Sequence, residues 1–486
     1  MPPAPFHSSP RRGALGPILV TLTSLAACAP GAPVQPGPAP AAHSDQVDAL
    51  FAELAGPATP GCAVGVVRDG ELVHGRGYGS ANLDHQVALD TRSVFYLASV
   101  SKQFAAAAVA LAAEEGYLSL DDDVRKHVPE LPEYGAPITV RHLVHHTSGL
   151  RDYLTLNSLS GRPSDRSWRT EEFLELVARQ RALNFDPGSE YLYSNTGYVL
   201  LTEIVRRATG RSMREYADER IYRPLGMRDT HFHDDAGRVV PRRVIGYSAA
   251  DGNEWRVNHW FAFDLVGDGG LYSTVEDLAR WDANFYDGRV GGPGFLGRMH
   301  ERGVLVGGDT ISYAFGLTLG EHRGLRTVEH GGALAGFRTN ILRIPDERFS
   351  AIVLCNTSAA IPARLARQIA EIHLGDRMSA PPPAADRAAT PSAQGEDEDS
   401  KAWPVAPAEL AGAYYSEELD AVYELVAEGD EVTARLASGQ SLAVRPLGSD
   451  ELAAGSLVLR LRRAGGEVTG FALDAGRVRG IEFVRR

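Results

Sequence analysis

A segment rich in proline and acidic residues divides this chain into two parts of different pattern. Residues 378–403 hold Pro381-Pro382-Pro383 and then the acidic run Glu396–Asp399. Such a composition buries little apolar surface and is typical of linkers. The chain has 486 residues, which is long enough for more than one domain at roughly 100–200 residues each. We therefore predict a linker at 378–403, with a larger domain before it and a smaller one after it.

The larger part, residues 45–377, alternates strand-like and helix-like segments. Two strand-like segments, Cys62–Val67 and Glu71–His74, flank the turn Arg68-Asp69-Gly70 and predict a β-hairpin. The segment Phe349–Leu354, apolar except for Ser350, predicts a buried strand.

Helices are expected at three places in the same part. The alanine-rich stretch 100–115 favours a helix that Gly116 closes. Ser273–Glu276 has the spacing of a capping box, which predicts a helix running toward Phe285. A closing helix is expected over 361–374.

The tail, residues 404–486, consists of short strand-like runs separated by glycine turns. Leu457, Leu459 and Leu461 alternate with more polar positions, which is typical of a strand buried on one side. Several such strands in about 80 residues predict a small antiparallel barrel or sandwich.

The N-terminus has the pattern of an export signal. Arg11 and Arg12 precede a short apolar run that ends at Leu25, and Leu25-Ala26-Ala27-Cys28 follows. This arrangement resembles a bacterial lipoprotein signal, which implies cleavage after residue 27, acylation of Cys28 and a Pro/Ala-rich tether over 28–44. We expect an exported protein held by this lipid on a bacterial membrane, facing the periplasm or the cell exterior. An ordinary signal peptide and a twin-arginine signal are the alternatives.

Charge and hydropathy exclude two functional classes. The formal net charge is −13 without a basic block, and nucleic-acid affinity needs clustered cations. The mean hydropathy is −0.18, and beyond the N-terminus no run of 18 apolar residues occurs, which excludes a polytopic membrane protein. We expect no nucleic-acid partner.

Beyond Cys28, two cysteines remain, Cys62 and Cys355, both in apolar strand-like runs. Free cysteine commonly behaves as a small core hydrophobe, so we expect two buried free thiols, with oxidation in an exported chain as the alternative. No Cys/His spacing suggests zinc, and no metal is expected.

The sharpest chemical pattern is Ser99-Val100-Ser101-Lys102 at the start of the alanine-rich helix. Residues three apart share a helix face, so Lys102 is expected beside Ser99. A serine hydroxyl needs a neighbouring base, and a lysine of lowered pKa can serve where an arginine cannot. The lysines of the chain are Lys102, Lys126 and Lys401, with arginine used elsewhere, so a lysine here suggests a need for an amine.

Two further segments carry candidate site residues. Tyr193-Ser194-Asn195 offers a tyrosine that could move a proton and an asparagine that could orient Lys102 and a substrate amide. His330-Gly331-Gly332 offers paired glycines, which let a backbone approach a ligand closely. Taken alone, a tyrosine bonded to backbone, an asparagine helix cap and a plain turn explain these segments equally well.

Together, the three segments resemble the penicillin-binding-protein and β-lactamase-like serine hydrolases, and within them the branch of class C β-lactamases, DD-peptidases, D-aminopeptidases and esterases. Further segments between 45 and 375 share the likeness: Phe95–Ala98, Gly116–Asp121, His146–Leu150, Pro224–Met227 and Gly269–Thr274.

The resemblance implies an α+β fold, with an antiparallel sheet flanked by helices, a helical subdomain and the site between them. It implies that Ser99 is acylated, that Lys102 and Tyr193 handle its proton, and that Asn195 contacts the substrate. The backbone N–H groups of Ser99 and Ala333 would form the oxyanion hole. No cofactor is implied. His145, His146, His259 and Glu329 are expected near this region without assigned roles.

The third segment departs from the family pattern. Relatives that process β-lactams usually carry Lys-Thr-Gly or Lys-Ser-Gly, where this chain has His330, Gly331 and Gly332 as candidate substrate-binding residues. With an ordinary pKa near 6.5, His330 would be mostly neutral at pH 7 and would gain charge as the pH falls toward 6. The His-Gly-Gly version resembles D-aminopeptidases and some esterases, and the tail over 404–486 resembles the lipocalin-like barrels appended to such peptidases.

We therefore expect a serine hydrolase that forms an acyl-enzyme and acts on peptides containing D-residues or on small esters. A class C-like β-lactamase or DD-carboxypeptidase is the enzymatic alternative. A penicillin-binding-like or ligand-binding protein without turnover is the non-enzymatic one. The oligomeric state stays open.

Overall fold

The computed structural model describes residues 41–163, 168–251, 254–258, 264–380 and 402–486, all within one compact unit. The expectations for the signal segment, for Cys28, for His259 and for most of the tether and the linker lie outside these ranges. No helix in the described ranges is long and apolar enough to cross a membrane.

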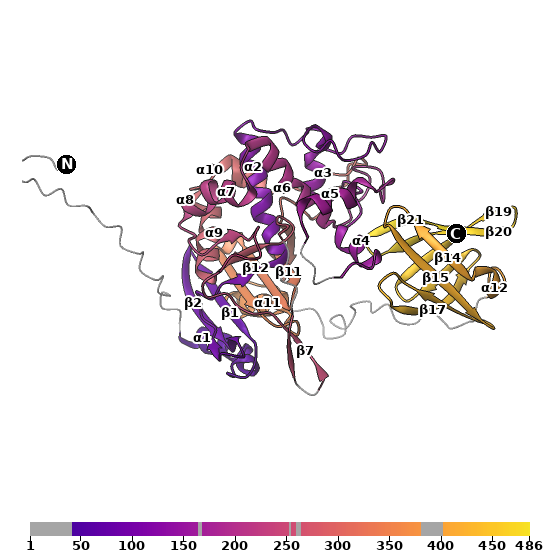
Figure 1. Cartoon of the computed structure of the whole chain (residues 1–486). Coiled ribbons are helices and arrows are strands. Elements are labelled where there is room, and N and C mark those ends of the chain that lie inside the picture. Colours follow the sequence, from indigo (N-terminus) through magenta and orange to yellow (C-terminus); the bar gives the residue numbers. More distant parts are fainter. Residues whose placement is uncertain (1–40, 164–167, 252–253, 259–263, 381–401) are drawn as a thin grey trace, which may run out of the picture. The chain divides into compact units, whose positions relative to one another are not determined.

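A six-stranded antiparallel sheet forms the centre of the larger part (Figure 1). Its order is β10 (Thr318–His322), β11 (Leu325–Leu334), β12 (Phe337–Ile344), β13 (Phe349–Cys355), β1 (Cys62–Arg68) and β2 (Glu71–Tyr78). The expected hairpin is confirmed, since β1 pairs with β2 from Arg68↔Glu71 onward. The expected buried strand is β13, whose seven residues are all buried.

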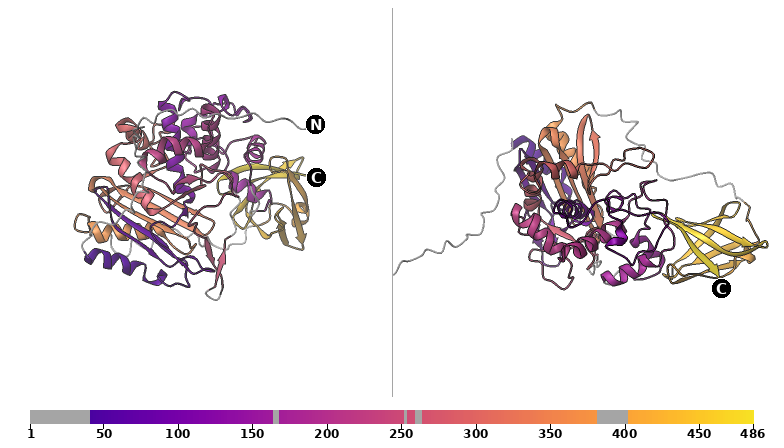
Figure 2. Two further views of the ribbon diagram at one scale, coloured as in Figure 1. Left: turned by 60° about the vertical axis from the view of Figure 1, so that its left-hand side comes forward. Right: turned by 90° about the horizontal axis from the view of Figure 1, so that it is seen from above.

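Helices cover both faces of this sheet (Figure 2). On one face, α11 (Pro362–Leu374) packs against β12 and β13, α1 (Ala41–Leu50) packs against α11, and together they bury an apolar cluster. On the other face, α9 (Val275–Asp287) lies directly on β1, where an added Cβ at Gly65 would come within 2.5 Å of Val275. The closing helix predicted over 361–374 is α11 and is confirmed.

The N-cap of α9 differs from the expectation by one residue. Thr274, not Ser273, is the N-cap, and its side chain accepts a hydrogen bond from Asp277 N. Ser273 belongs to the short strand β9 (Leu271–Ser273), and its pairing with Phe95 in β5 (Phe95–Tyr96) keeps it extended. The capping-box pattern therefore predicted the helix correctly, but the pairing of Ser273 in β9 makes the helix begin one residue later than expected.

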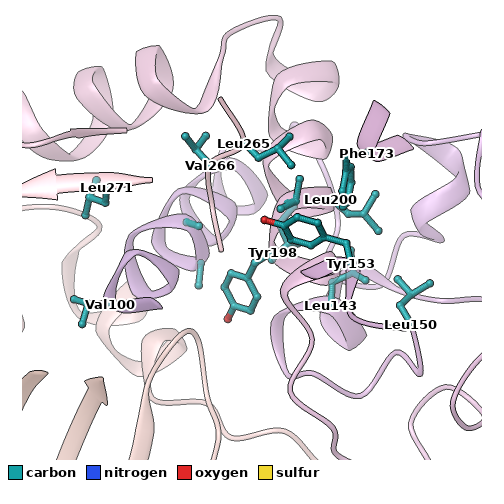
Figure 3. Close-up of a cluster of buried hydrophobic side chains, with 14 of the residues drawn as sticks. Val100, Leu143, Leu150, Tyr153, Phe173, Tyr198, Leu200, Leu265, Val266 and Leu271 are labelled. Atoms are coloured by element: carbon teal, nitrogen blue, oxygen red, sulfur yellow. The ribbon is translucent and has the colours of Figure 1, made fainter. Parts of the chain in front are cut away.

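A helical region stands beyond the sheet. It consists of α2 (Ser101–Glu114), α3 (Val140–Val144), α4 (Tyr153–Leu159), α5 (Thr170–Ala178), α6 (Asn195–Thr209), α7 (Met213–Ala217), α8 (Arg223–Leu225) and α10 (Gly292–Met299). The predicted alanine-rich helix is α2, which is buried from Ser101 to Ala112 and followed by Gly116 at φ +78°. Figure 3 shows side chains from this region, among them Tyr198 and Leu200 of α6, meeting in one apolar cluster.

The tail forms a closed antiparallel barrel, which confirms the expected fold of this part. Its eight strands run in chain order: β14 (Gly412–Ser416), β15 (Ala421–Glu428), β16 (Glu431–Arg435), β17 (Ser441–Gly448), β18 (Glu451–Ala454), β19 (Leu457–Ala464), β20 (Glu467–Ala475) and β21 (Val478–Arg485). Leu457, Leu459 and Leu461 point inward as the alternation predicts, being no more than 7% exposed.

The expectation of two free thiols is wrong. Cys62 and Cys355 form a disulfide, with their Cα atoms 4.0 Å apart. The two residues are direct partners in the register of β1 and β13, so the antiparallel pairing brings the thiols together. Residues 293 positions apart give no local sign of this neighbourhood.

Candidate active site

Ser99 stands in a short turn between strand β5 and helix α2. Ala98, the residue before it, has φ +49°, a left-handed conformation that is uncommon for a residue with a Cβ. The Ser101 hydroxyl stabilises this turn, because it donates to Ala98 O at 2.6 Å and accepts from Leu271 N at 3.1 Å. The Ser101 hydroxyl therefore links the backbone just before Ser99 to strand β9.

Lys102 lies beneath Ser99 on the first turn of α2, with its side chain fully buried. Its Nζ is 3.2 Å from Ser99 Oγ, 2.8 Å from Asn195 Oδ1 and 2.6 Å from the backbone oxygen of Asp268. An ammonium donates to all three groups. A neutral amine can donate to two of them and accept from the Ser99 hydroxyl through its lone pair.

Burial lowers the pKa of Lys102 to about 8, because the charged form loses its hydration. The carboxylates of Asp268 and Asp152 oppose this shift, and Arg477 adds to it. Burial also raises the pKa of Asp268, whose carboxylate accepts a hydrogen bond from the Tyr153 hydroxyl at 3.1 Å. A substantial fraction of Lys102 is thus neutral at slightly alkaline pH, as a general base requires.

Tyr193 lies against the same lysine, with its ring centroid 4.7 Å from Lys102 Nζ. Its buried hydroxyl makes no regular hydrogen bond among the described residues. Burial raises its pKa strongly, and the nearby Ser99 hydroxyl offsets part of this rise. The tyrosine is therefore a neutral hydroxyl next to the serine, able to pass a proton but not to act as a resident base.

Asn195 begins helix α6 and is held in one orientation. Its Oδ1 faces Lys102, and both its backbone N and its Nδ2 donate to Asp152 Oδ2 at 2.8 Å. One N–H of the amide stays free of these bonds, so Asn195 can still donate to a substrate.

His330 lies on β11 at the edge of the site and is neutral. Its Nδ1 is 2.7 Å from Gly331 O, so Nδ1 carries the proton and donates, while Nε2 accepts from the Tyr313 hydroxyl at 3.0 Å. Burial and the nearby Lys102 lower its pKa to about 4. The expectation that His330 gains charge near pH 6 is therefore wrong, because burial and the charge of Lys102 disfavour the protonated imidazole more than the hydrogen bond to Gly331 O favours it.

Gly331 and Gly332, the two glycines of the third segment, differ in what a side chain at each position would meet. A Cβ at Gly332 would lie 2.2 Å from Leu97 O and 2.4 Å from Thr339 Oγ1, so β11 can approach the Ser99 turn only with glycine there. A Cβ at Gly331 would meet nothing closer than 3.6 Å. Gly332 is required by the protein's own backbone, and Gly331 leaves space in the pocket.

A pocket of about 800 Å³ brings most of the predicted residues together. Its lining includes Ser99, Tyr193, Asn195, His330, Gly331, Gly332 and Ala333. Lys102 lies below it, in contact through Ser99 and Asn195. Two hydroxyl-bearing side chains, Ser99 and Tyr193, therefore line the pocket, and the buried amine of Lys102 lies beneath them.

His145, His146 and Glu329 do not line this pocket. His145 is bonded to Glu301 O, and His146 accepts from Ser194 N while its ring stacks near Tyr193. Glu329 pairs with Arg367. These groups support the surrounding structure.

Sequence reasoning missed three charged residues of the site: Asp152, Asp268 and Arg477. Asp152 holds Asn195, Asp268 contacts Lys102 through its backbone, and Arg477 reaches the pocket from the barrel. Asp268 had one local sign, its position in the glycine-rich run Gly267–Gly270. No group of side chains in the described ranges is arranged to hold a metal ion.

A buried lysine bonded to a serine at a helix start defines a class, the serine acyl-transfer enzymes that use lysine as base. The comparison with known families makes this specific: residues 47–374 match the family described as Beta-lactamase. The chain belongs to the Beta-lactamase family.

Two kinds of curated relative illustrate the family. A D-aminopeptidase from Cereibacter sphaeroides is 32% identical over 309 residues, covering 63% of this chain and 58% of the relative. Penicillin-binding protein 4* from Bacillus subtilis is 31% identical over 308 residues, covering 59% and 66%. The chain thus spans less than two thirds of the length of these relatives.

Solved structures agree on the fold. The octameric penicillin-binding protein homologue from Pyrococcus abyssi has a TM-score of 0.61 and 23% identity, covering 91% of this chain and 99% of that one. The D-amino acid amidase from Ochrobactrum anthropi SV3, complexed with D-phenylalanine, has a TM-score of 0.58 and 22% identity, covering 69% and 100%.

Proposed function

We propose that this protein is a serine hydrolase that works through an acyl-enzyme on Ser99. The observation that carries the proposal is the 3.2 Å contact between Ser99 Oγ and the buried Nζ of Lys102, whose pKa burial lowers to about 8. A lysine in this state can take the hydroxyl proton as the oxygen attacks a carbonyl carbon.

Acylation begins when Ser99 Oγ bonds to the substrate carbonyl carbon and its proton passes to Lys102. The carbonyl oxygen becomes an oxyanion, which the backbone N–H groups of Ser99 and Ala333 would stabilise. The bond to the leaving group then breaks. Tyr193 would relay the proton from Lys102 to the leaving nitrogen or oxygen, which leaves Ser99 acylated.

Deacylation repeats these steps with water. Lys102 accepts a proton from the water as its oxygen attacks the ester carbon, and the proton returns to Ser99 Oγ when that ester bond breaks. The products are a carboxylic acid and the free serine.

The proposed substrates are peptides containing D-residues or small esters. The names of the relatives support the first, because D-aminopeptidase and D-amino acid amidase both denote amide cleavage next to a D-residue. A peptide or another small molecule fits a pocket of about 800 Å³.

Intact-mass analysis tests the nucleophile. A fluorophosphonate should add one adduct to the protein, and peptide mapping should place it on Ser99. Ser99→Ala should remove the adduct and all turnover. An adduct on Ser101, or full activity in Ser99→Ala, would refute the proposal.

A side-by-side screen tests the substrate class. Nitrocefin, a short p-nitrophenyl ester and D-alanine p-nitroanilide would be compared at equal enzyme concentration. Nitrocefin turnover as fast as the best ester or amide turnover would promote the β-lactamase alternative.

We also propose that the protein is exported and carries a lipid on Cys28, which anchors it to a bacterial membrane. The support is the sequence Leu25–Cys28 after a short apolar run. Labelled palmitate should enter the wild-type protein, and Cys28→Ser should remove the label and release soluble protein. Unlabelled wild-type protein would indicate plain secretion instead.

A further inference from the structure

Positive charge dominates the side chains that line the catalytic pocket. Two arginines, Arg338 and Arg477, contribute to its lining, and the one carboxylate in that lining is Asp268, which is 8% exposed. Asp268 already accepts a hydrogen bond from Tyr153 and faces Lys102. A substrate ammonium would therefore meet two guanidinium groups, whereas a substrate carboxylate would be attracted by them.

Arg477 belongs to the barrel and reaches the pocket from the turn between β20 and β21. Its guanidinium lies 4.7 Å from the centroid of the Tyr193 ring. The nearest carboxylate oxygen in the described ranges, Asp152 Oδ2, is 3.9 Å away and accepts two hydrogen bonds from Asn195. The Arg477 side chain makes no hydrogen bond in the described part of the chain and is 45% exposed, so its five N–H groups are available.

The main chain of this turn is held in place by the hydrolase domain. Asn184 Nδ2 donates to Arg477 O at 3.0 Å, and Asn184 Oδ1 accepts from Arg479 N at 2.8 Å. Arg151 donates to Arg479 O and Gly480 O, and it forms a buried ion pair with Glu418 of the barrel. A side chain on so constrained a turn is presented to the pocket in a defined position.

We propose that Arg477 is a specificity residue that binds a carboxylate on the leaving-group side of the substrate. The inference rests on the proposed function and deepens it, since it names the substrate class as acyl peptides with a free C-terminal carboxylate. The planar guanidinium fork matches a carboxylate through two parallel hydrogen bonds.

The contact between Arg477 and the Tyr193 ring indicates where the substrate carboxylate would lie. In the proposed reaction Tyr193 passes a proton to the leaving nitrogen, and Arg477 lies over the Tyr193 ring. In a C-terminal residue, the carboxylate carbon is two bonds from that nitrogen. A carboxylate near Arg477 therefore puts the scissile nitrogen near Tyr193. His330 on β11 is neutral, so the barrel residue Arg477 supplies the positive charge at this side of the pocket.

Binding to a Ser99→Ala protein tests this inference independently of turnover. The ligand pair is Nα-acetyl-D-alanyl-D-alanine and its C-terminal amide, with D-alanyl-D-alanine amide as the free-amine probe. Calorimetry on the full chain would measure Kd for each. The variants are Arg477→Met, which keeps the apolar stem, and Arg479→Met, a control two residues further on in β21 whose guanidinium pairs with Glu190 outside the pocket.

The acid should bind at least about tenfold more tightly than its amide, the gain expected of a charge-assisted hydrogen-bonded contact. Arg477→Met should weaken binding of the acid by about ten- to a hundredfold and leave the amide within about twofold. Arg479→Met should leave the ratio unchanged. Equal binding of acid and amide, tighter binding of the free-amine probe, or an equal loss of both ligands in Arg477→Met would overturn the inference.

The fluorophosphonate experiment separates this result from the proposed function. An adduct on Ser99 without a preference for the acid would refute only the role of Arg477. Preference for the acid without any Ser99 adduct would refute the acyl-enzyme and leave Arg477 as the residue of a binding protein.

Discussion

Asp152 Oδ2 accepts hydrogen bonds from both the backbone N and the side-chain Nδ2 of Asn195, each at 2.8 Å. This double contact turns the Asn195 amide so that its oxygen faces Lys102. Asp152 also caps helix α4, since Oδ1 accepts from Thr155 N. One carboxylate thus orients the amide that accepts a hydrogen bond from Lys102.

Removing charges around Lys102 should move the pH–rate profile in opposite directions. The proposed mechanism requires neutral Lys102, so kcat/KM should rise as the pH increases through its pKa of about 8. Asp152 raises this pKa and Arg477 lowers it. Asp152→Asn should therefore shift the rising limb to lower pH, and Arg477→Met should shift it to higher pH, measured on a neutral ester. Shifts in the same direction would contradict the electrostatic account.

Lys102→Arg should be nearly as inactive as Lys102→Ala, a loss of at least about a hundredfold in kcat. Arginine keeps the positive charge but does not deprotonate in proteins. Stopped-flow measurement of Ser99 acylation compares the two variants, and thermal unfolding checks that both are folded. Arginine activity close to that of the wild type would mean that Lys102 acts only as a charge.

His330 should stay neutral throughout the range from pH 5 to 8, because its pKa is lowered to about 4. Its ordinary pKa in the unfolded chain is about 6.5, so the unfolded state binds more protons between these two values. The free energy of unfolding should therefore fall as the pH decreases from about 6.5 to 4. His330→Gln should reduce this slope in urea titrations at several pH values, and an NMR titration of His330 near pH 6.5 would contradict the prediction.

The two glycines of β11 should respond differently to a side chain. Gly331→Ser should leave the melting temperature and Ser99 acylation nearly unchanged, because nothing lies within 3.6 Å of the new Cβ. Gly332→Ala should destabilise the protein by about 1–3 kcal/mol, the usual range for overpacking, because its Cβ would meet Leu97 O at 2.2 Å. Thermal unfolding of the matched pair measures both, and equal effects would show that β11 shifts freely.

Breaking the ion pair between Arg151 and Glu418 should loosen the barrel turn. The two side chains are 1% and 6% exposed, so Arg151→Met leaves an unpaired buried carboxylate, at a cost of about 3–5 kcal/mol. Hydrogen exchange over residues 477–480 should increase. The double variant Arg151→Met/Glu418→Gln should recover part of the stability, and equal stability of single and double variants would show that Glu418 is solvated in place.

Short sequence patterns predicted many of the helices and strands. The β1–β2 hairpin, helices α2 and α11 and the inward leucines of β19 follow from spacing within a few residues, which is why the sequence predicted them. The contact between Ser99 and Lys102 could be predicted in the same way, because one helical turn brings the two residues together.

Contacts between residues far apart in the sequence could not be predicted from such patterns. Cys62 meets Cys355 only through the pairing of β1 with β13. Arg477 reaches Tyr193 only because the barrel turn is held by Asn184 and Arg151. The lowered pKa of His330 could not be predicted from the sequence either. It results from burial and from the charge of Lys102, which is 228 positions away and is brought near His330 only by the fold.

The disulfide between Cys62 and Cys355 closes a covalent ring. Ser99, Lys102, Tyr193, Asn195 and His330 all lie within it, and Arg477 lies outside. A single proteolytic cut anywhere in that ring opens it without releasing a fragment, so Ser99, Lys102 and strand β11 stay in one molecule. Arg477 lies outside the ring, so after a cut between Cys355 and the barrel only non-covalent contacts, such as the ion pair between Arg151 and Glu418, would hold it at the pocket.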